Sequence, residues 1–195
     1  FAFAGLFVAV FVSLGTVYLG EQVMPMLFFM LGCGLVRWEN VRGKDGQELK
    51  LELDVTDRAS CERFVEEAVH ELGGLDILIN NAGSLIARKS FAAAADPFWA
   101  DTMSLNLASL RKTTRAALPH LAAAARAHGG ASIVNLASLA GRKGGHTGSI
   151  AYATAKGAVL TFTRALATEL GPQGIRVNAL APGLILGTHF HNTHT

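Results

Sequence analysis

The 195 residues of the chain are enough for one ordinary domain with a sizeable hydrophobic core. The formal net charge is only +2, and no basic cluster is interleaved with aromatic side chains, which argues against nucleic acid as a partner. The cysteines, Cys33 and Cys61, are too few for a disulfide framework and lack metal-ligand spacing. We therefore expect a cytoplasmic domain with free thiols and no metal site.

The N-terminal segment, residues 1–36, is far more apolar than the rest and admits different interpretations. Residues 1–20 carry no charge and are long enough to cross a bilayer, which would leave the remainder anchored on the cytoplasmic side. The same segment also fits the start of a parallel α/β fold, with buried strands at 6–12 and 35–38 around a helix at 21–31. A foreign segment that has replaced the original start is a third alternative.

From residue 48 onward, strand and helix signals alternate. Apolar and polar side chains alternate over 49–54, and Thr56 is placed to cap a helix over 57–72 that Gly73 and Gly74 end. Further strands are expected at 75–80, 131–136 and 175–183, with helical segments at 97–127 and 152–170. Such alternation predicts an α/β fold with a parallel sheet and helices on both of its faces.

Tyr152 and Lys156 are the strongest candidates for chemistry. They are four residues apart in a segment with helical spacing, so the phenol and the ammonium share one helix face. A nearby cation favours the phenolate, which lets a tyrosine act as an acid or a base near neutral pH. Ser138 closely follows the predicted strand at 131–136, and strand ends are where α/β sheets place functional groups.

Several motifs lie along the chain in one order: Asp54-Val55, NNAG at 80–83, Asn106 in SLNLAS, then Ser138, Tyr152 and Lys156, and finally APGLI at 181–185. With these motifs in this order and spacing, residues 48–188 resemble a short-chain dehydrogenase/reductase of the compact, single-domain type. The resemblance implies a Rossmann-like, doubly wound parallel sheet and an enzyme that uses NAD or NADP. It also implies a small-molecule alcohol or ketone substrate, and a homo-oligomer paired through the two long helical segments when the protein is full length.

The resemblance assigns roles to individual residues. Tyr152 would exchange the proton and Ser138 would hydrogen-bond the substrate oxygen. Lys156 would lower the pKa of the phenol and hold the nicotinamide ribose, while the backbone carbonyl of Asn106 would help to hold a water near this lysine. Further cofactor contacts are implied for Asp54 and Val55 at the adenine ring, and for Asn81, Ala82, Gly83, Pro182, Gly183 and Ile185 elsewhere.

The N-terminal segment fits the resemblance less well. The family's first strand leads into a T-G-x-x-x-G-I-G turn, but residues 13–20 match it clearly only at Gly20, and Tyr18 would occupy the space of the pyrophosphate. We therefore interpret residues 1–47 as a degenerate first Rossmann unit or, alternatively, a membrane anchor. Residues 48–195 are interpreted as a dinucleotide-binding and catalytic domain that is incomplete at its C-terminal end.

The leading functional hypothesis is hydride transfer between a nicotinamide and a secondary alcohol or carbonyl. A catalytically silent remnant and a membrane-anchored reductase of lipid-like substrates are the alternatives. His189, His191 and His194 form H-x-H-x-x-H without a nearby carboxylate or cysteine. We expect a substrate loop or a frayed terminus there, and not a metal site.

Overall fold

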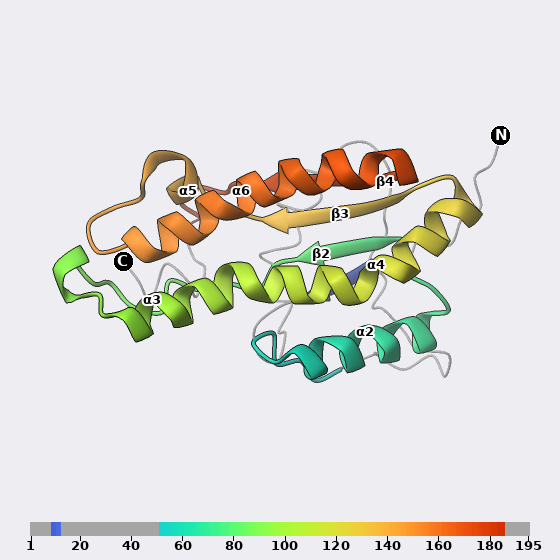
Figure 1. Cartoon of the computed structure of the whole chain (residues 1–195), viewed down its shortest axis with the longest axis horizontal. Helices are drawn as coiled ribbons and strands as arrows, with labels where there is room; N and C mark the ends of the chain where they lie inside the picture. Colours follow the sequence, from blue (N-terminus) through green and yellow to red (C-terminus); the bar gives the residue numbers. More distant parts are fainter. Residues whose placement is uncertain (1–8, 13–50, 186–195) are drawn as a thin grey trace.

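A four-stranded parallel sheet organises the fold (Figure 1). The structure, a computed structural model, describes residues 9–12 and 51–185. The strands are β1 (Ala9–Val12), β2 (Ile77–Asn80), β3 (Ala131–Leu136) and β4 (Ile175–Leu180), and they lie side by side in that order. Because neighbouring strands run in the same direction, their carboxyl ends all reach one edge of the sheet.

Helices fill the connections between the described strands. Helix α2 (Arg58–Leu72) precedes β2. The connection from β2 to β3 contains the 3-10 turn η1 (Phe91–Ala93), α3 (Asp96–Met103), the π-helical turn η2 (Ser104–Ala108) and α4 (Ser109–His128). The connection from β3 to β4 contains α5 (Leu139–Lys143), α6 (Ile150–Leu170) and the 3-10 turn η3 (Gly171–Gln173). This order confirms the predicted α/β fold with a parallel sheet.

The main core lies between the sheet and a layer formed by α2, α4 and α6, which cross the same side of the sheet in Figure 1. Leu78 of β2 and Ile133 of β3 are fully buried there, together with apolar side chains from these helices. Ile79 and Val134, the next residues along the strands, point to the opposite face and form a separate buried cluster. Within the described residues, the helices therefore cover one face of the sheet.

Asp57, and not Thr56, caps α2. The Asp57 carboxylate accepts hydrogen bonds from the backbone N–H groups of Ala59, over 3.3 Å, and Ser60, over 2.8 Å. The hydroxyl of Thr56 instead donates to Asp54 Oδ1 over 2.7 Å. The prediction of a cap at Thr56 is therefore wrong by one residue, because a carboxylate with two acceptor oxygens satisfies two of the free N–H groups at the helix start.

The long helical segment predicted at 97–127 is interrupted by η2. At this turn the backbone N–H of Ser109 donates to the carbonyl of Ser104, five residues earlier, in place of the usual four. The extra residue in the turn shifts the faces of α3 and α4 relative to each other. Asn106 lies within this turn, and the apolar periodicity of the sequence contains no signal for it.

Strand β1 places a small part of the N-terminal segment in the sheet. Ala9 pairs with Ile77 and Val12 pairs with Asn80, in parallel. The interpretation as a first Rossmann unit expects a strand at this point. The rest of residues 1–47, including Tyr18 and its turn, lies outside the described residues. None of the described helices is both long and apolar enough to cross a membrane.

Candidate active site

The carboxyl edge of the sheet brings together segments that follow different strands. Residues 81–83 follow β2, Ser138 follows β3, and residues 181–185 follow β4. The last two segments are joined directly, because the backbone N–H of Leu139 donates to the carbonyl of Pro182 over 2.8 Å. The first two turns of α6, which carry the predicted Tyr-Lys pair, pack against α5 beside this edge.

Lys156 is a buried cation at the centre of this region. Its residue is 3% exposed, and Nζ donates to the carbonyl oxygen of Leu136, the last residue of β3, over 2.7 Å. Burial disfavours the charged form and lowers the pKa of Lys156 to about 8. The ammonium is therefore still the main form at neutral pH, although much less strongly favoured than in an exposed lysine.

Tyr152 lies one turn before Lys156, with the lysine Nζ 5.8 Å from the centre of its ring. Burial of the phenol raises the pKa of Tyr152, and a hydrogen bond with the Ser138 side chain acts in the opposite direction. The predicted lowering of this pKa by Lys156 is therefore wrong for the structure described, because desolvation of the phenol is the larger effect. At neutral pH the group is a proton donor.

Ser138 has an extended backbone and caps α5. Its Oγ accepts a hydrogen bond from the backbone N–H of Ala140 over 3.1 Å, and the same side chain hydrogen-bonds Tyr152. A hydroxyl has two acceptor lone pairs and one donor proton, so it can take part in both contacts. The cap fixes the direction of the Ser138 side chain toward the tyrosine.

Asn106 is 1% exposed, and its side chain holds the segment after β2. Nδ2 donates to the carbonyls of Ser84, over 2.8 Å, and Thr102, over 3.0 Å, while Oδ1 accepts from the backbone N–H of Ser84 over 3.1 Å. The Asn106 side chain, which we call the clamp, therefore joins η2 to the segment that follows β2. The role predicted for the Asn106 backbone carbonyl stays a prediction.

Gly83 lies between the clamp and the buried cation. A Cβ atom at this position would come within 2.8 Å of both Asn106 Oδ1 and Lys156 Nζ, closer than real Cβ contacts. A side chain at this position would therefore require the ends of the Asn106 and Lys156 side chains to shift. The fold thus brings five of the predicted residues together, each next to the following one in this series: Asn106, Gly83, Lys156, Tyr152 and Ser138.

The remaining predicted cofactor residues differ in exposure. Asp54 is exposed, and its hydrogen bonds from the side chain and backbone of Thr56 lower the pKa of its carboxyl group. Val55 is 1% exposed and belongs to the main core, so its side chain does not present a surface to a ligand. At the sheet edge, Asn81 and Gly183 are exposed, Pro182 and Ile185 are half-buried, and Ala82 is buried.

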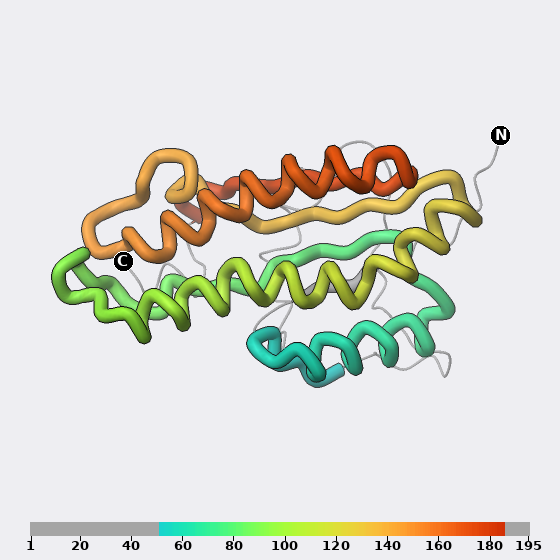
Figure 2. The backbone as a smooth tube through the Cα atoms, in the orientation of Figure 1, coloured from blue at the N-terminus to red at the C-terminus, as the bar shows by residue number. Residues whose placement is uncertain are grey.

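The loop between α5 and α6 meets the segment after β2 at the outer end of the site. The backbone N–H of Lys89 donates to the carbonyl of Gly148 over 2.9 Å, and the Arg88 guanidinium donates to the carbonyl of Thr147 over 3.2 Å. Figure 2 shows the two segments side by side at the left end of the molecule. These contacts join the segment after β2 to the loop that leads into α6.

A buried polar network under the site was not predicted. Asn80 and Asn135 are paired across β2 and β3, and Asn80 Nδ2 donates to Asn135 Oδ1 over 2.9 Å and to Thr114 of α4 over 3.0 Å. Asn135 Nδ2 donates to Thr163 of α6 over 3.0 Å. The network ties α4 and α6 to both strands. The signal available in the sequence was an asparagine near the carboxyl end of each of two mostly apolar strands.

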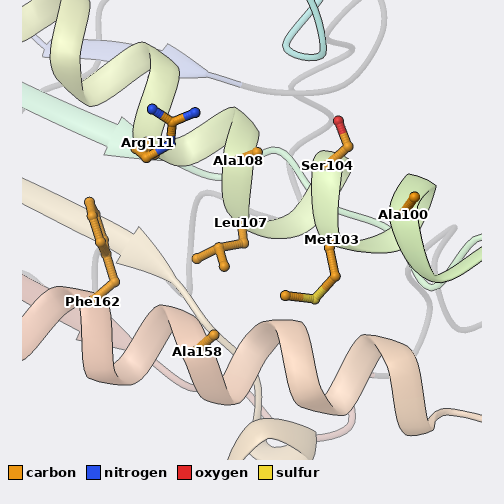
Figure 3. A pocket seen from close by; sticks show the side chains of 8 residues that line it. All are labelled: Ala100, Met103, Ser104, Leu107, Ala108, Arg111, Ala158 and Phe162. Carbon is orange, nitrogen blue, oxygen red and sulfur yellow. The ribbon is translucent and has the colours of Figure 1, made fainter.

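An apolar groove of about 440 Å³ lies outside this site, between α6 on one side and α3, η2 and α4 on the other. Figure 3 shows Met103, Leu107 and Phe162 pointing into the space between the helices. The remaining lining residues are Ala100, Ser104, Ala108, Arg111 and Ala158. Since none of the predicted catalytic residues lines it, the groove is a separate surface.

No group of three or more metal-ligating side chains occurs among the residues described.

Solved structures that resemble this one include two reductases with a bound cofactor. The NADH-dependent reductase A1-R' complexed with NAD is 36% identical, with a TM-score of 0.67, and the match covers 70% of this chain and 57% of that one. The 3-ketoacyl-(acyl-carrier-protein) reductase from Brucella melitensis complexed with NADH is 30% identical, with a TM-score of 0.66, and the match covers 69% and 55%.

Curated relatives match about the same share of this chain as the solved structures do. The putative ketoacyl reductase 2 of the granaticin polyketide synthase from Streptomyces violaceoruber is 42% identical over 139 residues, which are 70% of this chain and 53% of the relative. Nodulation protein G from Azospirillum brasilense is 42% identical over 133 residues, 68% of this chain and 51% of that protein. The chain thus spans about half the length of the curated relatives it matches.

A family described as short chain dehydrogenase matches residues 37–195. The chain belongs to the short-chain dehydrogenase family.

Proposed function

We propose that the protein is an NAD(P)-dependent oxidoreductase that reduces a carbonyl group to a secondary alcohol. The observation that carries this proposal is the placement of the half-buried phenol of Tyr152 beside the buried cation of Lys156, next to the hydroxyl of Ser138. Because burial raises the pKa of the phenol, Tyr152 holds its proton at neutral pH. A group in this state suits proton donation, which is the reductive direction.

A bound nicotinamide supplies the hydride that adds to the carbonyl carbon. As negative charge develops on the carbonyl oxygen, the Tyr152 hydroxyl donates its proton to that oxygen, and the Ser138 hydroxyl donates a hydrogen bond to it. The phenolate left on Tyr152 is then close to the Lys156 ammonium, which stabilises it until a proton returns from solvent. The Lys156 ammonium therefore acts after proton transfer, by stabilising the phenolate, although it does not lower the pKa of the phenol before the reaction.

The described residues fit the nicotinamide end of such a cofactor. The Lys156 ammonium and the Tyr152 hydroxyl are donors suited to a ribose diol, and Gly83 leaves the backbone bare beside them. Residues 181–185 are tied to α5 by the bond from Leu139 to Pro182, so a fixed backbone faces the same edge. The pyrophosphate end would depend on residues 13–20, which lie outside the described residues.

Titration with NADH and with NADPH, followed by the fluorescence of the reduced nicotinamide, tests cofactor binding directly. Reduction of a panel of small ketones then compares wild type with Tyr152→Phe. Loss of the proton donor should lower turnover by about 10² to 10⁴ with the far-ultraviolet circular dichroism unchanged. No binding of either cofactor would favour the catalytically silent alternative, and equal turnover in Tyr152→Phe would remove the assignment of the donor.

The groove between α6 and α4 suits a second copy of the chain. Leu107 and Phe162 present apolar side chains there, and an apolar surface of this kind is stabilised when it is covered. The elements that form it belong to the two long helical segments, 97–127 and 152–170, that are expected to pair between subunits. A pair with twofold symmetry would place the same surface of each copy against the other.

A further inference from the structure

We infer that Gly141 is a positioning residue for the Ser138–Tyr152–Lys156 site, because its missing side chain lets α5 rest directly on the backbone of α6 at Lys156. This inference rests on the function proposed above for that site. Gly141 is not among the residues that the motifs identify. It lies in α5, three residues after Ser138, and α5 packs on the N-terminal half of α6 (Figure 1).

The contact at Gly141 involves the main chain of α6. A Cβ atom at Gly141 would lie 2.5 Å from the carbonyl carbon of Lys156, 2.6 Å from the nitrogen of Gly157 and 2.7 Å from the carbonyl oxygen of Lys156. Real Cβ atoms essentially never approach other atoms below 3.0 Å. A flexible side chain could rotate away, but these atoms belong to a helix backbone and cannot move without moving the helix.

Gly157 completes the contact from the other side. A Cβ at Gly157 would lie 3.2 Å from the carbonyl oxygen of Gly141, which is tight and would require this oxygen to give way by a few tenths of an ångström. The two glycines thus form the crossing point of α5 and α6. An added Cβ would clash more severely at Gly141 than at Gly157. Close approach of two backbones is a common structural reason for glycine at such a position.

The crossing point connects the catalytic residues to one another. Ser138 caps α5, and the backbone N–H of Gly141 donates to the Ser138 carbonyl over 3.0 Å. On the other side, the ammonium of Lys156 is held by the carbonyl of Leu136, two residues before Ser138. The segment 136–141 therefore holds Lys156 at both its side chain and its main chain. The position of Ser138 relative to the Tyr152–Lys156 pair depends on this double contact.

A methyl group at Gly141 would separate the helices at this point. Ordinary van der Waals contact begins at 3.4 Å, so the backbones must move apart by about 1 Å. Displacement of catalytic groups by about 1 Å typically costs about 10²-fold in rate. The same movement admits water to Lys156, and relief of its burial should move its pKa upward from about 8 toward its ordinary value of 10.5.

The test compares Gly141→Ala and Gly157→Ala with wild type and with the control Gly171→Ala. The control lies at the C-terminal end of α6, with a helical φ of −53°, and apart from its chain neighbours and its own helix backbone no atom lies within 4 Å of its added Cβ. For each protein, carbonyl reduction is measured at a temperature well below its own unfolding midpoint. The pH midpoint for chemical labelling of Lys156 is measured by peptide mass spectrometry, a readout that needs neither cofactor nor substrate.

We expect Gly141→Ala to lower kcat about 10²-fold and to raise the labelling midpoint of Lys156, with smaller changes of both kinds in Gly157→Ala and none in Gly171→Ala. A lower melting temperature with unchanged kcat and midpoint would show a merely structural role and overturn the inference. If Gly141→Ala does not fold, Gly157→Ala decides by the same criteria. If wild type reduces no carbonyl, the proposed function fails, while the labelling midpoints still decide whether Gly141 positions Lys156.

Discussion

Burial of the Lys156 ammonium should cost the fold free energy at neutral pH, and Lys156→Met measures that cost. The pKa of this lysine is about 8 in the folded protein, against an ordinary value of 10.5. Between these two pH values the unfolded chain binds more protons than the folded chain, so stability rises with pH through this window. Below pH 8 both states are protonated, and the full penalty of about 3 kcal/mol applies.

Methionine is unbranched and similar in length, so it keeps the packing around the site while it removes the titrating group. The Leu136 carbonyl loses its donor in the variant, which costs about 1–3 kcal/mol at every pH. The pH dependence therefore separates the two effects. From pH 7 to pH 9, wild type should gain about 1 kcal/mol relative to Lys156→Met, as part of the penalty disappears.

Urea unfolding of both proteins at pH 7, 8 and 9 measures this difference. Tyr152 does not interfere, because burial raises the pKa of its phenol from an ordinary value of 10.0 and the group stays protonated in this range. Lys143→Met, at an exposed lysine of α5, is the matched control and should follow wild type. If the stability difference between Lys156→Met and wild type does not change from pH 7 to pH 9, the reasoning about the buried ammonium is refuted.

The remaining predictions concern the polar network and the groove. Asn135→Leu should lower the free energy of unfolding by about 1–3 kcal/mol, because it leaves the buried Nδ2 of Asn80 without one of its acceptors. Chemical denaturation measures this loss, and a variant as stable as wild type would contradict the prediction. Leu107→Glu places a charge in the groove and should shift the dimer toward monomer in sedimentation analysis, whereas Ala59→Glu, at an exposed position of α2, should not. The same mass for wild type and both variants would exclude this surface as the dimer interface.

Much of the fold follows from local patterns in the sequence. Strand β3 has the predicted bounds, Ala131–Leu136, because a short apolar run before polar and glycine-bearing residues is typical of a buried parallel strand. Helical spacing alone placed Tyr152 and Lys156 on one face of α6, since residues four apart always share a face. The family resemblance then connected this pair with Ser138 and Asn106, which lie far away in sequence.

Tertiary contacts decided the features that local patterns could not predict. The π-helical turn at η2 accompanies the bonds between Asn106 and Ser84, 22 residues apart in the chain. The close contact between Gly141 and Lys156 arises only when α5 folds back onto α6. The direction of the pKa shift of Tyr152 depended on its burial, which is a property of the packed structure and outweighs the hydrogen bond with the Ser138 side chain. The sequence by itself therefore identified the candidate side chains for the chemistry, whereas packing determined how far apart they lie and in which direction their pKa values shift, because distance and desolvation exist only once distant segments meet.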